Sequence, residues 1–370
     1  MKAKKQKKHL FRNILLGIAG LILLTVIILL IINQVCYLNE RKEHEKAGYY
    51  HGVDIGGGQK MNVVELGNPN GNHTIVGLAG MWVSDYCIFM NRVNEVIGVD
   101  NTLVYVDRAG NGYSDDTLKA QTVSQVVDDY RNALQKAGYE APYVLLPFSL
   151  GGLYATYWES NYPDEIEGVA YLSGSIFTGD IDTTGEGSGY TLDELSKAEV
   201  FTAMVSSRLG LQRFEKYTGV PMGMTALTDE ERRLTVMSEN RGYTFAILSE
   251  AKHEYQLYHE SRDTCVKNDI PKIYVDNTYT CADDLREYYT YMNAEMTAGG
   301  EEPMISPDMA DSLWNQMKAE EEEVLNSGVI PFVEAVGNCE LISIPGDHWI
   351  FLQKPEEVSQ AIIEFMENLP

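Results

Sequence analysis

Cysteine is scarce in this chain. Its 370 residues include five cysteines, and these form no C-x-x-C pair and no zinc-binding spacing. This pattern excludes a small scaffold held by many disulfides and a zinc site built from clustered cysteines. The sequence leaves one disulfide undecided, between Cys265 and Cys281, and this bond would need an oxidising compartment. The alternative is that the scattered cysteines are simply buried.

Signals for a bound cofactor or metal are also missing. The glycine-rich stretch 185–189 follows no predicted strand and opens no predicted helix, which a dinucleotide-binding loop would do. The segment that begins at Asp180 starts like a calcium-binding loop, but its twelfth residue is Thr191, where the loop needs glutamate. We therefore expect no cofactor and no metal.

Acidic residues are absent from the first 38 positions, whereas six basic residues precede an uncharged run from Ile14 to Ile32. At about 1.5 Å per residue this run can cross a hydrocarbon core of roughly 30 Å. It has no polar face, which argues against a buried core helix, and no small-residue cleavage site follows it. We expect a basic cytoplasmic tail (1–13), a transmembrane signal anchor (14–33) and a linker (34–48). The rest of the chain would then be extracytoplasmic, held at the cell membrane by this single span in the lipid bilayer.

Positive charge is in deficit beyond the apolar run. All 54 acidic residues lie after position 38, against 23 basic ones, so the outer part has a formal charge of −31. This charge disfavours nucleic acid and anionic membrane surfaces as partners. The four glutamates at 320–323 are typical of a solvent-exposed helix face.

From residue 49 onward, short β-rich runs alternate with longer helical ones. This order predicts an α/β protein with a mostly parallel central sheet flanked by helices. Helical periodicity fits 122–138, which Gly138 would end. The apolar stripe of this helix consists of Val126, Val127, Tyr130 and Leu134. The predicted strands are 58–67, 73–80, 102–110, 143–149, 167–174, 271–277 and 339–346.

One interval interrupts the alternation. Residues 176–263 are helical in pattern and contain no predicted strand, although they stand between two core strands. That is the position of a helical lid. The core would then have a first part, 49–175, and a second part, 264–370, with an extra helical insertion at about 280–322.

Ser149 stands between an apolar strand and a helical pattern, in the motif Pro147-Phe148-Ser149-Leu150-Gly151. A serine at such a junction can cap the helix by accepting a hydrogen bond from a free N–H group. It can also be the nucleophile of a sharp elbow, G-x-S-x-G, where the flanking small residues permit the turn. Gly151 meets this requirement, and Pro147 replaces the upstream glycine at a strand end, where its missing N–H costs no ladder bond.

Four motifs in order decide between these two interpretations. They are Leu78-Ala79-Gly80-Met81 after a strand, the turn YVDRAGNGYSDD at 105–116, the serine elbow, and the C-terminal segment 344–369 around His348. Together they resemble the α/β-hydrolase fold family over residues 49–370. The resemblance implies that Ser149 is the nucleophile and His348 the general base. It also implies an oxyanion hole formed by the backbone N–H groups of Met81 and Leu150. Asp107 and Arg108 would fix the turn at 105–116.

The acid that would orient His348 is less well defined. The family usually places it after the strand that follows the lid, where this chain has Asp276, with Asp283 and Asp284 as alternatives. We predict Asp276, because it stands where the strand ends, whereas the other two acids precede a helix whose dipole they complement. Some members place the acid one strand earlier, and there this chain has Ser173.

These observations predict a serine hydrolase that cleaves a carboxylic ester, or an amide, of a small acyl substrate through an acyl-enzyme. An aminopeptidase is less favoured, because no distinct acidic motif would hold a substrate amine. Dehalogenase chemistry is disfavoured, because its nucleophile in this fold is an aspartate. The alternative from another class is a catalytically silent hydrolase-like domain that binds a ligand or a partner.

Overall fold

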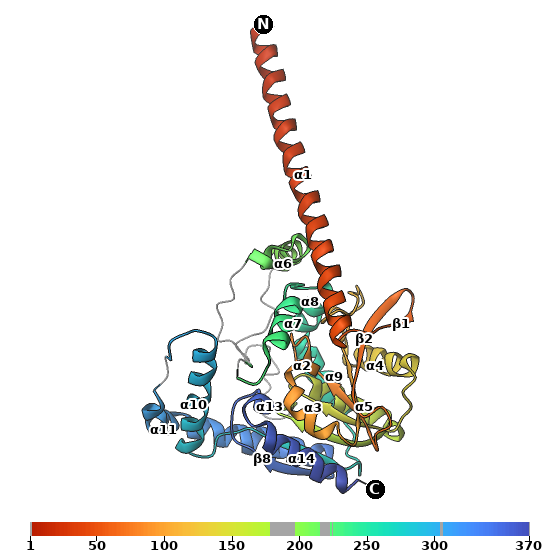
Figure 1. Cartoon of the computed structure of the whole chain (residues 1–370), viewed down its shortest axis with the longest axis vertical. Coiled ribbons are helices and arrows are strands. Elements are labelled where there is room, and N and C mark those ends of the chain that lie inside the picture. The colour runs from red at the N-terminus through yellow and green to blue at the C-terminus, as the bar shows by residue number, and fades with distance from the viewer. Residues whose placement is uncertain (1, 178–196, 215–222, 224, 304–305, 370) are drawn as a thin grey trace.

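A computed structural model describes residues 2–177, 197–214, 223, 225–303 and 306–369. The domain is built on a twisted sheet with helices on both faces, and one long helix projects from it (Figure 1). The strands occur in the spatial order β1-β2-β4-β3-β5-β6-β7-β8. Their bounds are β1 (Gly52–Gly56), β2 (Gln59–Gly67), β3 (Thr74–Leu78), β4 (Thr102–Val106), β5 (Tyr143–Pro147), β6 (Ile166–Leu172), β7 (Lys272–Asp276) and β8 (Cys339–Ser343).

The prediction of a mostly parallel sheet is confirmed. β2 pairs antiparallel with β1 and β4, and every other pairing in the sheet is parallel. The sequence did not predict β1. This edge strand has glycine at both ends and a register shift between Asp54 and Gly56, so its alternation is too short to stand out from a loop.

Helices cover the two faces of the sheet. Two buried clusters, one on each side of the sheet, form the hydrophobic core. One face is covered by α4 (Val123–Ala137), α5 (Gly151–Asn161), α9 (Glu254–Thr264) and α12 (Ile330–Val336). The other is covered by α2 (Tyr86–Phe89), α3 (Asn91–Ile97), α13 (Ile350–Gln353) and α14 (Pro355–Glu367).

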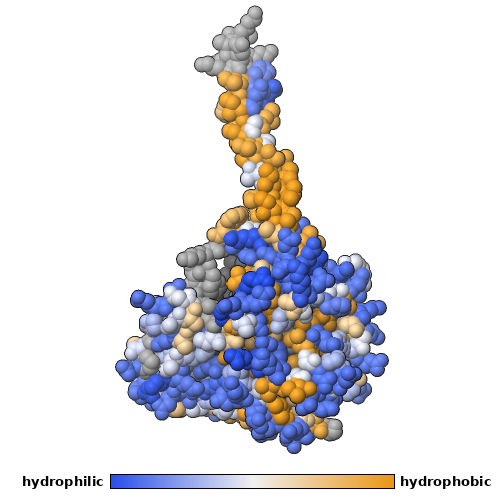
Figure 2. All heavy atoms as spheres, viewed as in Figure 1, coloured by the Kyte–Doolittle hydropathy of each residue, from blue (hydrophilic) through white to orange (hydrophobic). Residues whose placement is uncertain are grey.

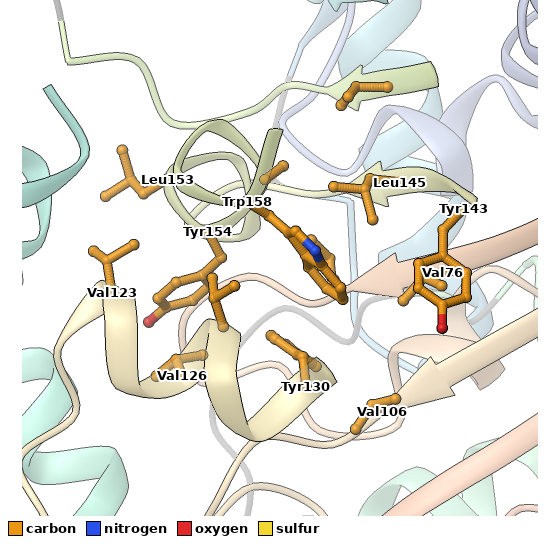
Figure 3. Packing of buried hydrophobic residues seen from close by; sticks show 14 of the residues in the cluster. Val76, Val106, Val123, Val126, Tyr130, Tyr143, Leu145, Leu153, Tyr154 and Trp158 are labelled. Atoms are coloured by element: carbon orange, nitrogen blue, oxygen red, sulfur yellow. The ribbon is translucent and has the colours of Figure 1, made fainter. Parts of the chain in front are cut away.

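Helix α4 follows the periodicity read from the sequence. The Thr122 side chain caps its start by accepting from the Gln125 N–H, and Gly138 ends it in the left-handed region at φ 96°. The four stripe residues are all buried. Figure 3 shows Val126 and Tyr130 of α4 directed toward Tyr154 and Trp158 of α5. Here the local pattern alone sufficed to place the helix.

Between β6 and β7, the described residues form several helices. They are α6 (Lys197–Leu209), the 3₁₀ turn η3 (Leu211–Phe214), α7 (Asp229–Glu239), α8 (Phe245–Lys252) and α9. The last of these, predicted as part of the lid, packs instead on α5, where the Ser261 hydroxyl donates to the Leu153 carbonyl. The two loop segments at 180–191 lie outside the described residues.

A second helical stretch joins β7 to β8. It consists of α10 (Ala282–Ala298), the 3₁₀ turn η4 (Pro307–Met309), α11 (Ala310–Glu323), the π-helical η5 (Val324–Val329) and α12. Another 3₁₀ turn, η1 (Pro163–Glu165), lies earlier in the chain, between α5 and β6. Three of the four glutamates at 320–323 are exposed, as expected, and Glu321 is half-buried because it accepts from the Tyr279 N–H.

Helix α1 runs without a break from Lys2 to Ala47. Over the described residues it is the helix that is long and apolar enough to cross a membrane, and its apolar side chains are exposed (Figure 2). The segment 34–48, expected as a linker, continues this helix to Ala47 and packs on the domain. His44 there is fully buried beside Asp85. All five cysteines are free, so Cys265 and Cys281 form no disulfide.

Candidate active site

Four consecutive strands bring polar side chains to one edge of the sheet. Ser149 follows β5, Ser173 follows β6, Asn277 follows β7 and His348 lies beyond β8. Because these strands are parallel, their carboxyl ends meet at the same edge, which is where open α/β sheets place their sites. Residues almost 200 positions apart are thereby collected in one place.

Ser149 occupies a strained turn. Its φ is 49°, in the left-handed region that a residue with a Cβ rarely adopts, and helix α5 begins two residues later. The turn requires small neighbours: a Cβ on Gly151 would lie 2.2 Å from the Leu78 carbonyl oxygen, and one on Gly80 would lie 3.0 Å from Ser149 Cβ. Pro147 is the last residue of β5, as expected. Such strain at a nucleophile elbow presents the hydroxyl above the sheet.

His348 is held through its Nδ1 atom. Ser173 Oγ lies 2.7 Å from His348 Nδ1 and donates to Asn277 Oδ1 at 2.7 Å. We therefore assign the proton of His348 to Nδ1, which donates to Ser173 and leaves Nε2 as an acceptor. The ring of His348 also packs on Phe148, the neighbour of Ser149, with 4.8 Å between the ring centroids. Ser149 and His348 thus lie near one another at the same edge of the sheet.

The three acids predicted as orienting residues make other contacts. The Asp276 carboxylate accepts from the Thr278 hydroxyl at 2.6 Å. Asp283 pairs with Arg286 on the surface, and Asp284 accepts from the backbone of Thr280 and Cys281 at the start of α10. Over the described residues, none of these carboxylates hydrogen-bonds to His348.

The nearest acid in sequence is also turned away. Asp347 accepts at 2.7 Å from the backbone N–H of His348 and not from its ring. Among the described residues, the side chain that contacts His348 Nδ1 is Ser173, one strand earlier than the position predicted for the acid. This differs from the predicted Ser149–His348–Asp276 arrangement.

Burial lowers the pKa of His348 from its usual value, because partial desolvation disfavours the imidazolium. The side chain is still exposed on one side, so solvent moderates the effect. Burial acts in the opposite direction on Asp276, raising the pKa of that carboxyl. A neutral imidazole near neutral pH can accept a proton from a hydroxyl.

Backbone donors flank the serine. Leu150 is the residue that leads into α5, and Met81 follows Gly80, which packs directly on Ser149. In the described part of the chain, the N–H groups of Met81 and Leu150 have no hydrogen-bond partner. Free N–H groups at a helix start can stabilise negative charge on an oxygen.

Arg108 fixes the loop that leads to Met81. Its guanidinium donates to the carbonyls of Ala79 (2.5 Å) and Gly80 (2.9 Å), and it pairs with Glu250 of α8 through two hydrogen bonds of 2.7 and 3.0 Å. Both charged side chains are 2% exposed. Arg108 was predicted as a turn-fixing residue, and its hydrogen bonds also tie α8 to the loop beside Ser149.

Two polar residues of this site were not predicted. Asn277 directly follows Asp276. The sequence predicted Asp276 as the orienting residue, because carboxylates usually take that role. Glu250 was treated as a lid residue, and nothing local marks it as the partner of a residue 142 positions earlier. No group of three or more His, Cys, Asp or Glu side chains in the described ranges could hold a metal ion.

Comparisons with known proteins agree with this architecture. No protein-family model matches the chain. The chain is 23% identical over 321 residues to the uncharacterized protein YbdG of Bacillus subtilis (strain 168), a match that covers 86% of this chain and 85% of that protein.

Solved structures give the fold. An epoxide hydrolase mutant of Vigna radiata superposes with a TM-score of 0.59 at 13% identity, covering 86% of this chain and 98% of that one. An epoxide hydrolase of Bacillus megaterium in complex with an inhibitor gives 0.55 at 13% identity, covering 86% and 100%. This chain has the α/β-hydrolase fold.

Proposed function

We propose that this α/β-hydrolase-fold chain is a membrane-anchored serine hydrolase that cleaves a carboxylic ester, or an amide, through an acyl-enzyme. The observation that carries the proposal is the strained Ser149 elbow, at the same sheet edge as His348. The hydrolytic enzymes among its structural neighbours support the reaction class. The substrate would be a small molecule with an acyl group.

The mechanism follows from the roles that the side chains can take. His348 Nε2 accepts the proton of Ser149 Oγ while that oxygen attacks the substrate carbonyl carbon. The N–H groups of Met81 and Leu150 stabilise the resulting oxyanion, each contributing roughly 3 kcal/mol to the transition state. The imidazolium then protonates the leaving alcohol or amine as its bond to the acyl carbon breaks. Water, deprotonated by His348, attacks the acyl-enzyme and releases the acid and Ser149.

Ser173 and Asn277 would replace the usual carboxylate as orienting groups. The chain of hydrogen bonds from His348 Nδ1 through Ser173 to Asn277 fixes the ring and its tautomer. A neutral hydroxyl stabilises the imidazolium less than a carboxylate does. This same observation favours the second candidate function, a hydrolase-like domain that binds a ligand without turning it over.

The membrane part of the proposal rests on α1. Its first residues are basic, its apolar stretch fits a bilayer, and its side chains there are exposed. The N-terminus would be cytoplasmic and the hydrolase domain extracytoplasmic. Burying so many apolar side chains in lipid would remove them from water.

Active-site labelling distinguishes the two candidate functions. A fluorophosphonate probe should react with the full chain at Ser149, because only an activated serine attacks it at a useful rate. Ser149→Ala should abolish labelling and lower any kcat by several orders of magnitude. It should leave the melting temperature nearly unchanged, since alanine retains the Cβ and the same backbone strain.

Ser160→Ala is the matched control. Ser160 lies in α5 as well, but at its far end, where its hydroxyl accepts from the Val266 N–H. This variant should be labelled like the wild type. A wild-type chain that is folded and inert to the probe would instead establish the silent binding domain.

A further inference from the structure

Helix α1 is clamped to the lid where its apolar stretch ends. Asn33, the first polar residue after Ile32, donates to the carbonyls of Ser207 (3.2 Å) and Arg208 (3.1 Å) in the last turn of α6. Arg213 of η3 donates to Asn33 Oδ1 and also pairs with Glu40 of α1. A span that crosses the bilayer would therefore place α6 at the bilayer surface (Figure 1).

The clamp extends along the next turns of α1. Asn240 donates to Glu40, Arg233 pairs with Glu43 at 3.5 Å, and His44 lies 3.4 Å from Asp85 with both side chains buried. Because these contacts involve both α7 and the core, α1 cannot pivot freely on the domain. The orientation of the domain is therefore linked to that of the span.

Helix α6 presents two apolar side chains on its outer face, beside the exposed Thr202 and Arg208. Phe201 and Val205, one turn apart, point outward and are 67% and 38% exposed. On the opposite side of the helix, Ala203, Ser206 and Ser207 line a cavity. A helix at a protein surface normally turns its apolar stripe inward and its polar face to water. Phe201 and Val205 on the outer face fit an apolar surrounding, and Arg208 beside them fits the headgroup boundary.

Neighbouring segments add to this face. Phe214, beside the clamping Arg213, is 76% exposed, and Leu118 is 80% exposed. Leu118 lies in the loop of Asp116, which pairs with Arg208 of α6. Single exposed apolar residues are ordinary on any protein, but these are gathered around the end of one apolar helix.

A cavity beneath α6 reaches Trp82, the residue after Met81. It has a volume of about 800 Å³ and is bounded by α6, η3, α7 and the loop at Trp82. Trp82 directly follows Met81, the proposed oxyanion donor, and its indole is half exposed. A molecule that entered under α6 would thus approach the oxyanion loop from the side that faces α1.

We propose that Leu118, Phe201, Val205 and Phe214 form a membrane-contact face, and that the hydrolase draws an acyl ester dissolved in the bilayer through the cavity under α6. The inference rests on the proposed function, because it needs α1 to be an anchor and Ser149 to be a nucleophile. The side chains would lie at the boundary between headgroups and acyl chains, as those of interfacial helices do. Uncharged or zwitterionic lipid fits best, since the outer part of the chain is strongly negative.

Photolabelling of the full chain tests the contact face directly. The protein is reconstituted in phosphatidylcholine vesicles that contain a phosphatidylcholine with a diazirine on its acyl chain, and labelled peptides are identified by mass spectrometry. Labelling of 197–214 as well as 14–32, with 91–101 unlabelled, is the expected result. Labelling of 14–32 alone overturns the contact face and leaves the anchor intact. Absence of label in 14–32 overturns the anchor and the contact face with it.

Kinetics in the same vesicles test substrate delivery. Changing the four face residues to serine should lower hydrolysis of a long-chain ester dissolved in the vesicles at least tenfold, relative to a water-soluble acetate ester. The matched control changes four equally apolar exposed residues elsewhere, Val99, Val266, Val324 and Leu341, to serine and should leave this ratio unchanged. If the rate of long-chain ester hydrolysis relative to acetate ester hydrolysis is the same in both variants, delivery from the bilayer is overturned. A wild type that cleaves neither ester overturns the proposed function and delivery, while the photolabelling still decides the contact face.

Discussion

A hydroxyl holds Nδ1 of His348, where the fold family usually has a carboxylate. Ser173 Oγ accepts a hydrogen bond from the ring N–H and donates its own O–H to Asn277 Oδ1, so the ring is fixed without a formal negative charge beside it. Two consequences follow for the chemistry. The orientation of His348, the proposed base, depends on Ser173, and its basicity lacks the increase that an adjacent carboxylate would give.

The first consequence is tested by comparing Ser173→Ala with Asp276→Asn. Ser173→Ala should lower kcat by about 10- to 100-fold, because one hydrogen bond to a charged group contributes about 1.5–3 kcal/mol. Asp276→Asn should leave kcat within a few-fold, because that carboxylate is bonded to Thr278. Steady-state kinetics and melting temperatures of both variants provide the measurement. A loss of 10³- to 10⁴-fold in Asp276→Asn with a nearly normal Ser173→Ala would restore Asp276 as the orienting acid.

The second consequence concerns pH. Desolvation lowers the pKa of His348, so the neutral base persists to more acidic pH than an ordinary histidine would allow. The acid limb of kcat/KM reports this group and should therefore have its midpoint below about 6.5. Ser173→Asp would place a carboxylate beside Nδ1, favour the imidazolium and move the limb to higher pH. An acid limb that does not move in Ser173→Asp would show that Ser173 is not next to the working base.

Sequence patterns predicted Ser149 and His348, which lie at one edge of the sheet, but not the contact of Ser173 with His348. Ser149 and His348 are marked by their immediate neighbours, a glycine after an apolar strand and a strand before a closing helix. Asp276 and Asn277 are adjacent at the end of β7, and successive strand residues point to opposite faces. Which of the two faces His348 depends on how β6, β7 and β8 align, and that register is tertiary information.

Among the elements, the connection between α8 and the loop of Ala79 and Gly80 has the clearest energetic consequence. Arg108 and Glu250 are both buried, and the Tyr154 hydroxyl also donates to Glu250. Removing one partner of a buried pair leaves an uncompensated charge and costs about 3–5 kcal/mol. Glu250→Leu should therefore lower the free energy of unfolding by an amount in this range, measured by denaturant unfolding.

The double variant Arg108→Met, Glu250→Leu separates stability from positioning. It removes both charges, so much of the lost stability should return. The carbonyls of Ala79 and Gly80 would still lack their donor, and the Met81 N–H would lose its fixed place. We expect kcat to stay about 10²-fold low with little change in KM, since small misplacements cost this much. Full recovery of kcat along with stability would mean that Arg108 acts only in folding.

Elements set by local pattern were predicted, and those set by distant contacts were not. α4 has a cap, a stripe and a terminal glycine within one stretch of chain. The helical state of 34–47 and the packing of α9 on α5 depend on partners far along the sequence, such as Arg213 for Glu40 and Leu153 for Ser261. Nothing within those segments distinguishes such contacts from solvent exposure.

At the scale of the whole molecule, α1 projects from the domain and, in the proposed function, would connect it to a bilayer in a fixed orientation. The six basic residues before the apolar stretch predict that this end stays in the cytoplasm, while the hydrolase domain lies outside. The described structure offers a reporter for this topology. Cys281 at the start of α10 is exposed, whereas the other four cysteines are half-buried or buried.

A membrane-impermeant maleimide applied to intact cells should therefore label Cys281, because the thiol faces the medium if the domain is extracytoplasmic. Cys281→Ser should remove this signal and retain the helix start, since serine is a good N-cap. In that background, Lys5→Cys should react only after the membrane is permeabilised, because residue 5 would lie in the cytoplasm. Labelling of both positions only after permeabilisation would contradict an extracytoplasmic domain. Recovery of a mature chain that begins near residue 36 would show that the apolar helix is cleaved and does not anchor the domain. The contacts of Glu40 and His44 would then still hold the shortened helix on the surface of the domain.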